Sequence, residues 1–162
     1  GLPVVIAKRR RIPMDCLNPE IKSLNYLNNI LAKVEAIDAG VLEAIMLNER
    51  GEVAECTGDN IFLIKDGIIS TPDTSAGMLH GVTRRFVIDT IAPAMGYTVV
   101  ERPHQVSEFM EADEVFLTGT AAEVIGVNKI DETVIGNGAV GPITAQLTER
   151  FRALVREDAV ED

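Results

Sequence analysis

The sequence predicts one α+β domain in which helices pack against mixed and antiparallel sheets. The chain has 162 residues, of which 46% are hydrophobic, so it can bury one core of ordinary size. Its strand-like segments follow one another as hairpins rather than alternating strictly with helices, which disfavours a doubly wound parallel sheet. We find no repeat, low-complexity tract or long linker that would divide the chain into two compositional zones.

Short apolar segments bounded by turn residues predict seven strands. The dipeptide Asp66-Gly67, which is typical of tight hairpins, joins two of them. The central strands together indicate a β-meander. The predicted strands span residues 2–7, 42–47, 60–65, 68–71, 97–101, 114–117 and 123–130.

Four segments predict helices. In the first, apolar residues recur at spacings of three and four and Gly40 follows as a stop, which predicts an amphipathic helix. In the second, which ends before Gly96, we expect Pro93 to kink or shorten the last turn. Ser107 is a candidate N-cap for the third. The predicted helices span residues 24–39, 81–95, 107–112 and 142–156.

The charge balance excludes two classes of partner. With 15 Lys and Arg against 25 Asp and Glu, the net charge of −10 repels phosphate backbones and anionic lipid headgroups. We therefore expect no nucleic-acid partner and no membrane partner, and no apolar run approaches the roughly 20 residues that span a bilayer. The basic run at residues 8–11 is interpreted as a solvated edge or turn.

The cysteine and histidine positions argue against a metal site. Cys16 and Cys56 lie far apart without metal-ligand spacing, which favours a reducing compartment, the cytoplasm, over a disulfide scaffold. His80 and His104 are isolated, so both are expected to be ordinary surface or loop residues. Because the first residue is Gly and a strand begins at once, we expect the sequence to be a piece of a longer chain.

Lys22 and Glu55 are the candidate reactive side chains. Lys22 precedes a helix that Ser23 could cap, and the helix dipole with partial desolvation would lower the pKa of its amine. A neutral lysine is the nucleophile of Schiff-base chemistry, and the alternative is a solvated surface lysine. Glu55 lies where a strand ends in a small-residue turn. Its carboxylate could pair there with a cationic ring nitrogen, and the alternative is a solvated hairpin glutamate.

Two segments could bind an anion. Residues 81–83, Gly-Val-Thr, open a helix and offer free N–H groups with a hydroxyl. Residues 118–120, Thr-Gly-Thr, offer a second hydroxyl and amide cluster after a strand. The two could share one phosphate, although each alone is also a common cap or turn.

Four segments together resemble a known family. The motifs IKSLNYLNN, ECTGDNIF, GVTR and ADEVFLTGTAAE, at residues 21–29, 55–62, 81–84 and 112–123, resemble the fold-type IV pyridoxal-phosphate enzymes. The greatest similarity is to branched-chain amino-acid aminotransferases, and it extends in order and spacing from about residue 1 to residue 147. The resemblance implies a fold like that of D-amino-acid aminotransferase. It identifies residues 1–162 as the large C-terminal domain, which binds pyridoxal phosphate.

The resemblance also implies residue roles. Lys22 would bind pyridoxal 5'-phosphate covalently and then carry a proton, Glu55 would pair with the pyridine nitrogen, and Tyr26 would reach the phenolic oxygen. Glu55 would keep that nitrogen protonated, which makes the ring a better electron sink. The other implied contacts are Leu79 on the ring, Val82, Thr83 and Thr120 on the phosphate, and the amides of Thr120 and Ala121 on the substrate carboxylate.

The chain departs from the family pattern in three places. Gly126 stands where the family usually has proline, and Pro93 interrupts a helix that is normally uninterrupted. The small N-terminal domain is absent from the sequence. In the family that domain supplies an arginine to the phosphate and much of the pocket for the substrate side chain.

The resemblance predicts transfer of the amino group of leucine, isoleucine or valine to 2-oxoglutarate by a dimer or larger homo-oligomer. Its partners would be small amino acids and 2-oxo acids. One alternative is another fold-type IV activity, D-amino-acid aminotransferase or aminodeoxychorismate lyase. The other is a catalytically incompetent fragment, which would expose apolar surface where the missing domain docks.

Overall fold

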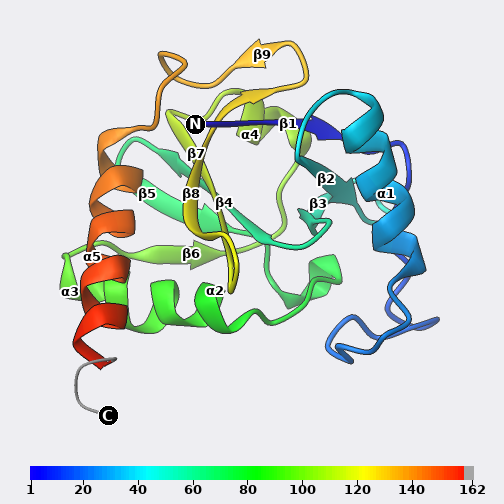
Figure 1. The fold of residues 1–162 in the computed structure, drawn as a ribbon, viewed down its shortest axis with the longest axis horizontal. Helices are drawn as coiled ribbons and strands as arrows, with labels where there is room; N and C mark the ends of the chain where they lie inside the picture. Colours follow the sequence, from blue (N-terminus) through cyan, green and yellow to red (C-terminus); the bar gives the residue numbers. More distant parts are fainter. Residues whose placement is uncertain (159–162) are drawn as a thin grey trace.

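The computed structural model describes residues 1–158, and within them nine strands form one curled mixed sheet (Figure 1). The predicted α+β class is confirmed. The 60–65, 68–71 and 123–130 strands have the predicted bounds, and the other predicted strands differ by one or two residues at an end. The strands are β1 (Leu2–Ile6), β2 (Glu43–Leu47), β3 (Val53–Cys56), β4 (Asn60–Lys65), β5 (Ile68–Thr71), β6 (Val99–Glu101), β7 (Glu114–Gly119), β8 (Glu123–Ile130) and β9 (Thr133–Val134).

The strand order corrects the predicted β-meander. The order is β3-β2-β1-β8-β7-β4-β5-β6, with β9 beside β8, so β2 and β4 are separated by three strands. Only the β4–β5 hairpin of the expected meander forms, with Asp66 and Gly67 at φ of 50° and 76° in its turn. Both positive values suit the tight turn that this dipeptide predicts. The parallel pairs are β1–β2, β1–β8 and β5–β6.

Side chains alternate between the two faces of β4 and β7, and each face has its own core. Phe62 and Phe116 stack on one face with ring centroids 4.6 Å apart. Leu147 and Phe151 of the long C-terminal helix cover them. Ile61 and its neighbours face the other way, toward a short helix. The helices are α1 (Leu27–Asp38), α2 (Val82–Phe86), α3 (Ala92–Ala94), α4 (Val106–Met110) and α5 (Pro142–Asp158), with a 3₁₀ turn η1 (Thr74–Ala76).

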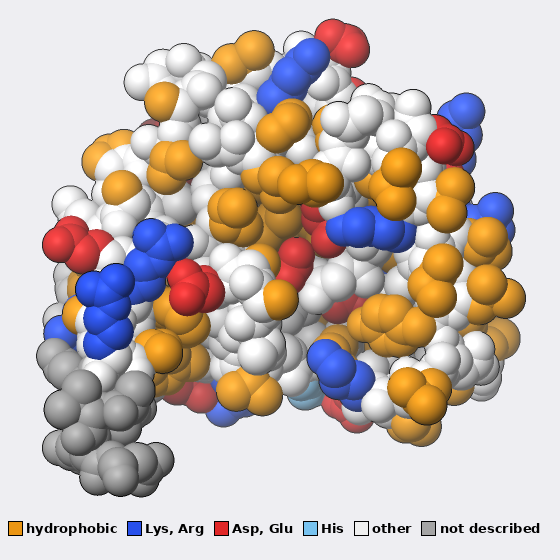
Figure 2. Space-filling view, viewed as in Figure 1, with side chains coloured by type: hydrophobic (Ala, Val, Ile, Leu, Met, Phe, Trp, Pro, Cys, Tyr) orange, Lys and Arg blue, Asp and Glu red, His pale blue; other side chains and the backbone are white. Residues whose placement is uncertain are grey.

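Helix α1 is oriented with its apolar stripe toward solvent. Its buried residues are Asn29, Ala32 and Ala36, whereas Leu27 and Ile37 are each 60% exposed. The small alanines let the helix approach Ala44 and Met46 of β2 closely, which explains this orientation. Figure 2 shows the exposed apolar side chains gathered over α1, at the right of the view. The stripe comprises Leu27, Ile30, Leu31, Val34 and Ile37.

The start of α1 also corrects the sequence analysis. The helix begins at Leu27 rather than at residue 24, and Tyr26 occupies its N-cap without a side-chain cap. Ser23 does not cap it, because the Ser23 Oγ accepts a bond from the Asn25 N–H at 3.2 Å instead. Lys22 therefore lies five residues before the helix. The helix-dipole argument therefore does not apply to its amine.

Two other helix details differ from expectation. A π-helical turn, η2 (Val87–Ile91), precedes Pro93 and widens the backbone where the proline has no N–H to donate. Pro93 thus alters the helix as predicted, and Gly96 follows at φ 81°. In α4 the N-cap is Gln105, which forms a capping box with Glu108, so the prediction of Ser107 as cap is wrong.

Candidate active site

A cavity of about 250 Å³ brings together seven of the eight predicted site residues. Ala121, the eighth, lies in the β7–β8 turn and does not line the cavity. A larger groove, of about 640 Å³ between β8 and α5, contains none of them. The seven come from four parts of the chain far apart in sequence. They are Lys22, Tyr26, Glu55, Leu79, Val82, Thr83 and Thr120.

Glu55 lies within β3 at the bottom of this cavity, with a side chain only 6% exposed. This position excludes the solvated hairpin glutamate. Its Oε2 accepts bonds from the Leu79 N–H at 3.1 Å and the Asn60 Nδ2 at 3.3 Å. Among the described residues its Oε1 has no aligned hydrogen-bond donor, so it keeps a lone pair for a ligand. Burial raises the pKa of Glu55 to about 7, against the opposing effect of the Arg11 charge.

Arg11 corrects the interpretation of the basic run. Lys8, Arg9 and Arg10 are exposed, as expected, but the Arg11 side chain is only 10% exposed. Its Nη2 lies 2.9 Å from the Glu55 Oε1. The last residue of the run is therefore part of the site.

Lys22 and Tyr26 line the cavity from the segment before α1. Lys22 is exposed, and no carboxylate within the described part of the chain lies at ion-pair distance from its Nζ. Its amine can therefore point at a ligand. Burial, followed by the charge of Glu55, raises the pKa of the Tyr26 phenol, so Tyr26 is a proton donor at neutral pH.

Two glycines shape the anion-binding end. A Cβ at Gly81 would meet the Asn60 Oδ1, and a Cβ at Gly119 would meet the Asp59 Oδ1, both far inside van der Waals distance. A larger residue at either position would have to displace that side chain. The absence of a Cβ lets Asn60 and Asp59 lie against the backbone at this end of the cavity.

Thr83 and Thr118 supply hydroxyls at this end of the cavity. Both side chains are buried, and the Thr118 Oγ1 has no partner among the residues that the structure describes. A buried hydroxyl without a partner is costly unless a ligand satisfies it. The predicted anion site thus gains a specific unsatisfied group.

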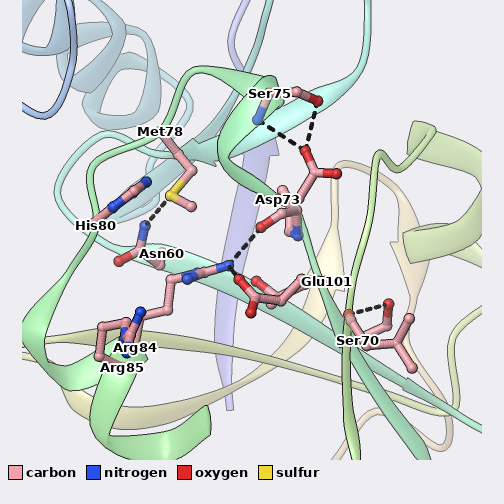
Figure 3. Close-up of polar contacts among 12 residues, drawn as sticks. Asn60, Ser70, Asp73, Ser75, Met78, His80, Arg84, Arg85 and Glu101 are labelled. Carbon is pink, nitrogen blue, oxygen red and sulfur yellow. Dashed lines mark hydrogen bonds and ion pairs between the residues drawn. The ribbon is translucent and has the colours of Figure 1, made fainter. Parts of the chain in front are cut away.

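Arg84 fixes the segment that carries Val82 and Thr83. Its fully buried Nη2 donates to the Pro72 carbonyl at 2.8 Å and pairs with the Glu101 Oε2 at 2.6 Å. Figure 3 shows Arg84 and Glu101 pointing toward one another. The start of α2 is therefore anchored to β6.

The two histidines lie in different environments. His104 lies in the loop between β6 and α4, as one of the two expected settings, but it is fully buried with its Nε2 2.7 Å from the Ser70 Oγ, so it is not a surface residue. His80 lies at the edge of the cavity, 3.3 Å from Glu20. Across residues 1–158 no group of three His, Cys, Asp or Glu side chains could hold a metal ion. No helix in that range is long and apolar enough to cross a bilayer.

The sequence analysis missed the polar residues that support Glu55. Asn60 was part of a recognised motif but carried no predicted role, and Arg11 was hidden in a basic run. Asp59 also lines the cavity, and burial together with Glu43 raises its pKa to about 6. These residues carry no signal beyond their motif positions, because only the folded sheet brings them together.

Comparison with known proteins supplies the family. The family model for amino-transferase class IV matches residues 2–130. The chain belongs to this family. It is 48% identical over 152 residues to a putative branched-chain-amino-acid aminotransferase of Methanocaldococcus jannaschii. The aligned region covers 94% of this chain and 52% of the relative. It is also 43% identical over 136 residues to a D-alanine aminotransferase of Listeria monocytogenes, covering 83% of the chain and 46% of the relative.

Solved class IV aminotransferases have the same fold. A branched-chain amino acid aminotransferase of T.th., in complex with 4-methylvaleric acid, matches with a TM-score of 0.92 and 40% identity over 96% of this chain and 52% of that one. The Thermobaculum terrenum enzyme in its PLP form matches with a TM-score of 0.91 and 40% identity over 96% and 51%. The predicted fold-type IV architecture is confirmed. The chain spans about half the length of the relatives that it matches.

Proposed function

We propose that this protein is a pyridoxal-phosphate-dependent aminotransferase that transfers the amino group of leucine, isoleucine or valine to 2-oxoglutarate. The observation that carries the proposal is the single cavity that joins Lys22, Glu55 and Thr83. Pyridoxal phosphate presents an aldehyde, a ring nitrogen and a phosphate. An amine, a carboxylate and a hydroxyl cluster are the groups that would hold them.

The residues present fit this cofactor. The free lone pair on the Glu55 Oε1 can accept a bond from a protonated ring nitrogen, and the unpartnered Thr118 hydroxyl can donate to a phosphate. Gly81 and Gly119 line the cavity beside these groups and add no side chain of their own there. Leu79 lies beside Glu55, where its side chain would pack on the ring.

When bound, the cofactor supplies an electron-withdrawing ring that stabilises negative charge on the substrate Cα. Lys22 would bind the cofactor through its Nζ and, once released, carry the proton between the substrate Cα and the cofactor carbon. Glu55 would hold the ring nitrogen in its protonated form, and Tyr26 would donate to the phenolic oxygen. The roles of Thr83, Val82 and Thr120 would be to bind the phosphate.

The branched-chain preference is supported by the relatives. Enzymes of that description match over nearly the whole chain, and one was solved with 4-methylvaleric acid, a branched aliphatic acid. The turn amides of Thr120 and Ala121 would bind the substrate carboxylate. We further infer that residues 1–162 are the large domain of a homo-oligomer, with a small N-terminal domain completing the pocket. The exposed apolar stripe on α1 is consistent with such packing.

A second candidate is transamination of D-alanine, because the Listeria relative is 43% identical. Half-reactions of the full-length protein with L-leucine and with D-alanine, followed by absorbance of the bound cofactor, distinguish the two. We expect amino transfer from L-leucine and little from D-alanine. No half-reaction with L-leucine would contradict the branched-chain assignment.

Covalent labelling tests the cofactor site directly. After incubation with pyridoxal phosphate, borohydride reduction makes the cofactor–lysine bond permanent, and peptide mass mapping locates it. We expect labelling at Lys22 that is lost in Lys22→Ala. The control is Lys129→Ala, since Lys129 pairs with Glu132 on the surface far from the cavity and its removal should leave the labelling intact. Labelling scattered over several lysines would refute the assignment.

A further inference from the structure

Arg11 is a largely buried cation that contacts Glu55 from outside the cavity lining, and the proposed function assigns it no role. It follows β1, and its backbone N–H donates to the Leu47 carbonyl at 2.8 Å, which fixes it to the end of β2. Its side chain reaches Glu55, 44 positions later in the sequence. Buried cations are rare unless they are paired, so the pair with Glu55 needs an explanation.

The guanidinium of Arg11 is held from three directions. Its Nη2 lies 2.9 Å from the Glu55 Oε1, and its Nη1 donates to the Asn29 Oδ1 at 2.6 Å. Its Nε donates to the Gly77 carbonyl at 3.5 Å. Asn29 is itself fixed, because its Nδ2 donates to the Thr57 carbonyl at 2.9 Å. The charge of Arg11 therefore cannot move away from Glu55.

The carboxylate of Glu55 is fixed from the other side. The Leu79 N–H and the Asn60 amide both donate to Oε2, whereas Oε1 lies 2.9 Å from the Arg11 Nη2. Two other charges face Glu55. Lys22 attracts its negative charge and Asp59 repels it, and of all these groups Arg11 is the strongest influence that favours the charged form.

We propose that Arg11 is a positioning residue that opposes the effect of burial on Glu55, favours its charged form and aims it into the cavity, so that the proton shared with the cofactor lies on the ring nitrogen. The statement about the ring rests on the proposed function. The statement about Glu55 does not. A carboxyl buried this deeply takes up a proton at neutral pH unless a fixed cation opposes it. A protonated Glu55 could no longer hold a positive charge on the ring.

Arginine suits this position better than lysine would. Its planar fork can contact Glu55 and Asn29 at once, and it stays charged when it is desolvated. A lysine would keep the charge but would lose one of these contacts. The charge and the orientation of Arg11 can consequently be separated by substitution.

The first test measures Glu55 in the cofactor-free protein, expressed at its full natural length. The Glu55 signal in a carbon-13 carboxyl NMR titration is assigned with Glu55→Gln. We expect Arg11→Met to raise the midpoint of this titration by about one pH unit or more, and Arg11→Lys to keep it within about half a unit. Arg10→Met, in the exposed neighbour, is the matched control and should leave the midpoint unchanged.

The second test uses the protein loaded with pyridoxal phosphate. In Arg11→Met the pH at which the bound cofactor changes its absorbance should move, and Arg11→Lys should restore it. A purely structural role would lower stability without moving either midpoint. An unchanged Glu55 midpoint in folded Arg11→Met would overturn the proposal.

Misfolding of Arg11→Met does not remove the test. The double variant Arg11→Met with Glu55→Leu deletes both charges and should then fold, since the defect would be an unpaired buried carboxylate. Failure of the double variant would show that Arg11 serves packing alone, and would also overturn the proposal. If Lys22 is not labelled but the Glu55 titration midpoint still rises in Arg11→Met as expected, only the proposed function is refuted.

Discussion

The floor and the rim of the cavity differ in how the fold holds them. The floor consists of Glu55, Asn60 and Thr118, which lie on β3, β4 and β7 and are all buried. The rim consists of Lys22 and Thr120, which lie on irregular segments and are exposed. Floor groups are desolvated and fixed by the sheet, whereas rim groups are solvated and can adjust to a ligand. Charge changes at the floor should therefore have much larger effects than charge changes at the rim.

The largest expected difference concerns stability. Glu55→Ala leaves the Arg11 charge buried without a partner, which should cost about 3–5 kcal/mol of unfolding free energy. The comparable exposed pair beside the rim joins Glu20 to His80, with side chains 48% and 37% exposed. Glu20→Ala should cost less than about 1 kcal/mol. Urea unfolding of both variants measures this, and equal losses would contradict the comparison.

The pH dependence of stability should show the same contrast. The pKa of Glu55 is about 7 in the folded chain, above its ordinary value of 4.5, so the folded state binds this proton more tightly than the unfolded state. Its contribution is fully present below pH 4.5 and is lost as the pH rises through 7, on the order of 3 kcal/mol.

Glu55→Gln tests this slope, because it removes the titrating group. Unfolding free energy measured from pH 4 to 8 without cofactor should fall less steeply in the variant. Asp59, with a pKa of about 6, contributes in the same direction, so Asp59→Asn should remove a smaller part. A Glu55→Gln profile as steep as that of the unmodified chain would show that other groups dominate.

The smallest expected effect concerns two hydroxyls. Thr118→Val removes a buried hydroxyl that has no partner among the described residues, so stability should stay the same or rise by up to about 1 kcal/mol. Thr120→Val at the exposed rim should change it by less than about 0.5 kcal/mol. Thermal unfolding of both variants without cofactor measures these shifts. A loss above about 1 kcal/mol in Thr118→Val would mean that the Thr118 hydroxyl is satisfied in the protein.

The sequence predicted the features that depend on neighbouring residues. Short apolar segments and the Asp66-Gly67 turn placed the β4–β5 hairpin correctly, because both act within a few positions. The motifs that contain Lys22, Glu55 and Thr83 also led to one cavity. The hairpin and the motifs are each determined by residues close in the sequence, so distant contacts do not change them.

The features that sequence could not give depend on distant segments. The apolar stripe of α1 follows a regular helical spacing, yet Ala32 and Ala36 decide which side is buried because β2 presents small side chains there. From the sequence, Arg11 is predicted to be the end of a solvated basic run, and only the folded structure shows that it contacts Glu55. Neither the buried side of α1 nor the contact of Arg11 is determined by residues close in the chain.

The pairing of β1 with β8 has a consequence for synthesis on the ribosome. Val4 lies opposite Ile130, and the Ile6 N–H donates to the Asp131 Oδ1 at 3.0 Å across 125 positions. At about 5–20 residues per second, β1 leaves the ribosome roughly 6–25 s before its neighbour exists. The edge of β1 that faces β8 must stay unpaired for that time, although β2 can pair with the other edge earlier, so the sheet closes only after most of the chain has been made.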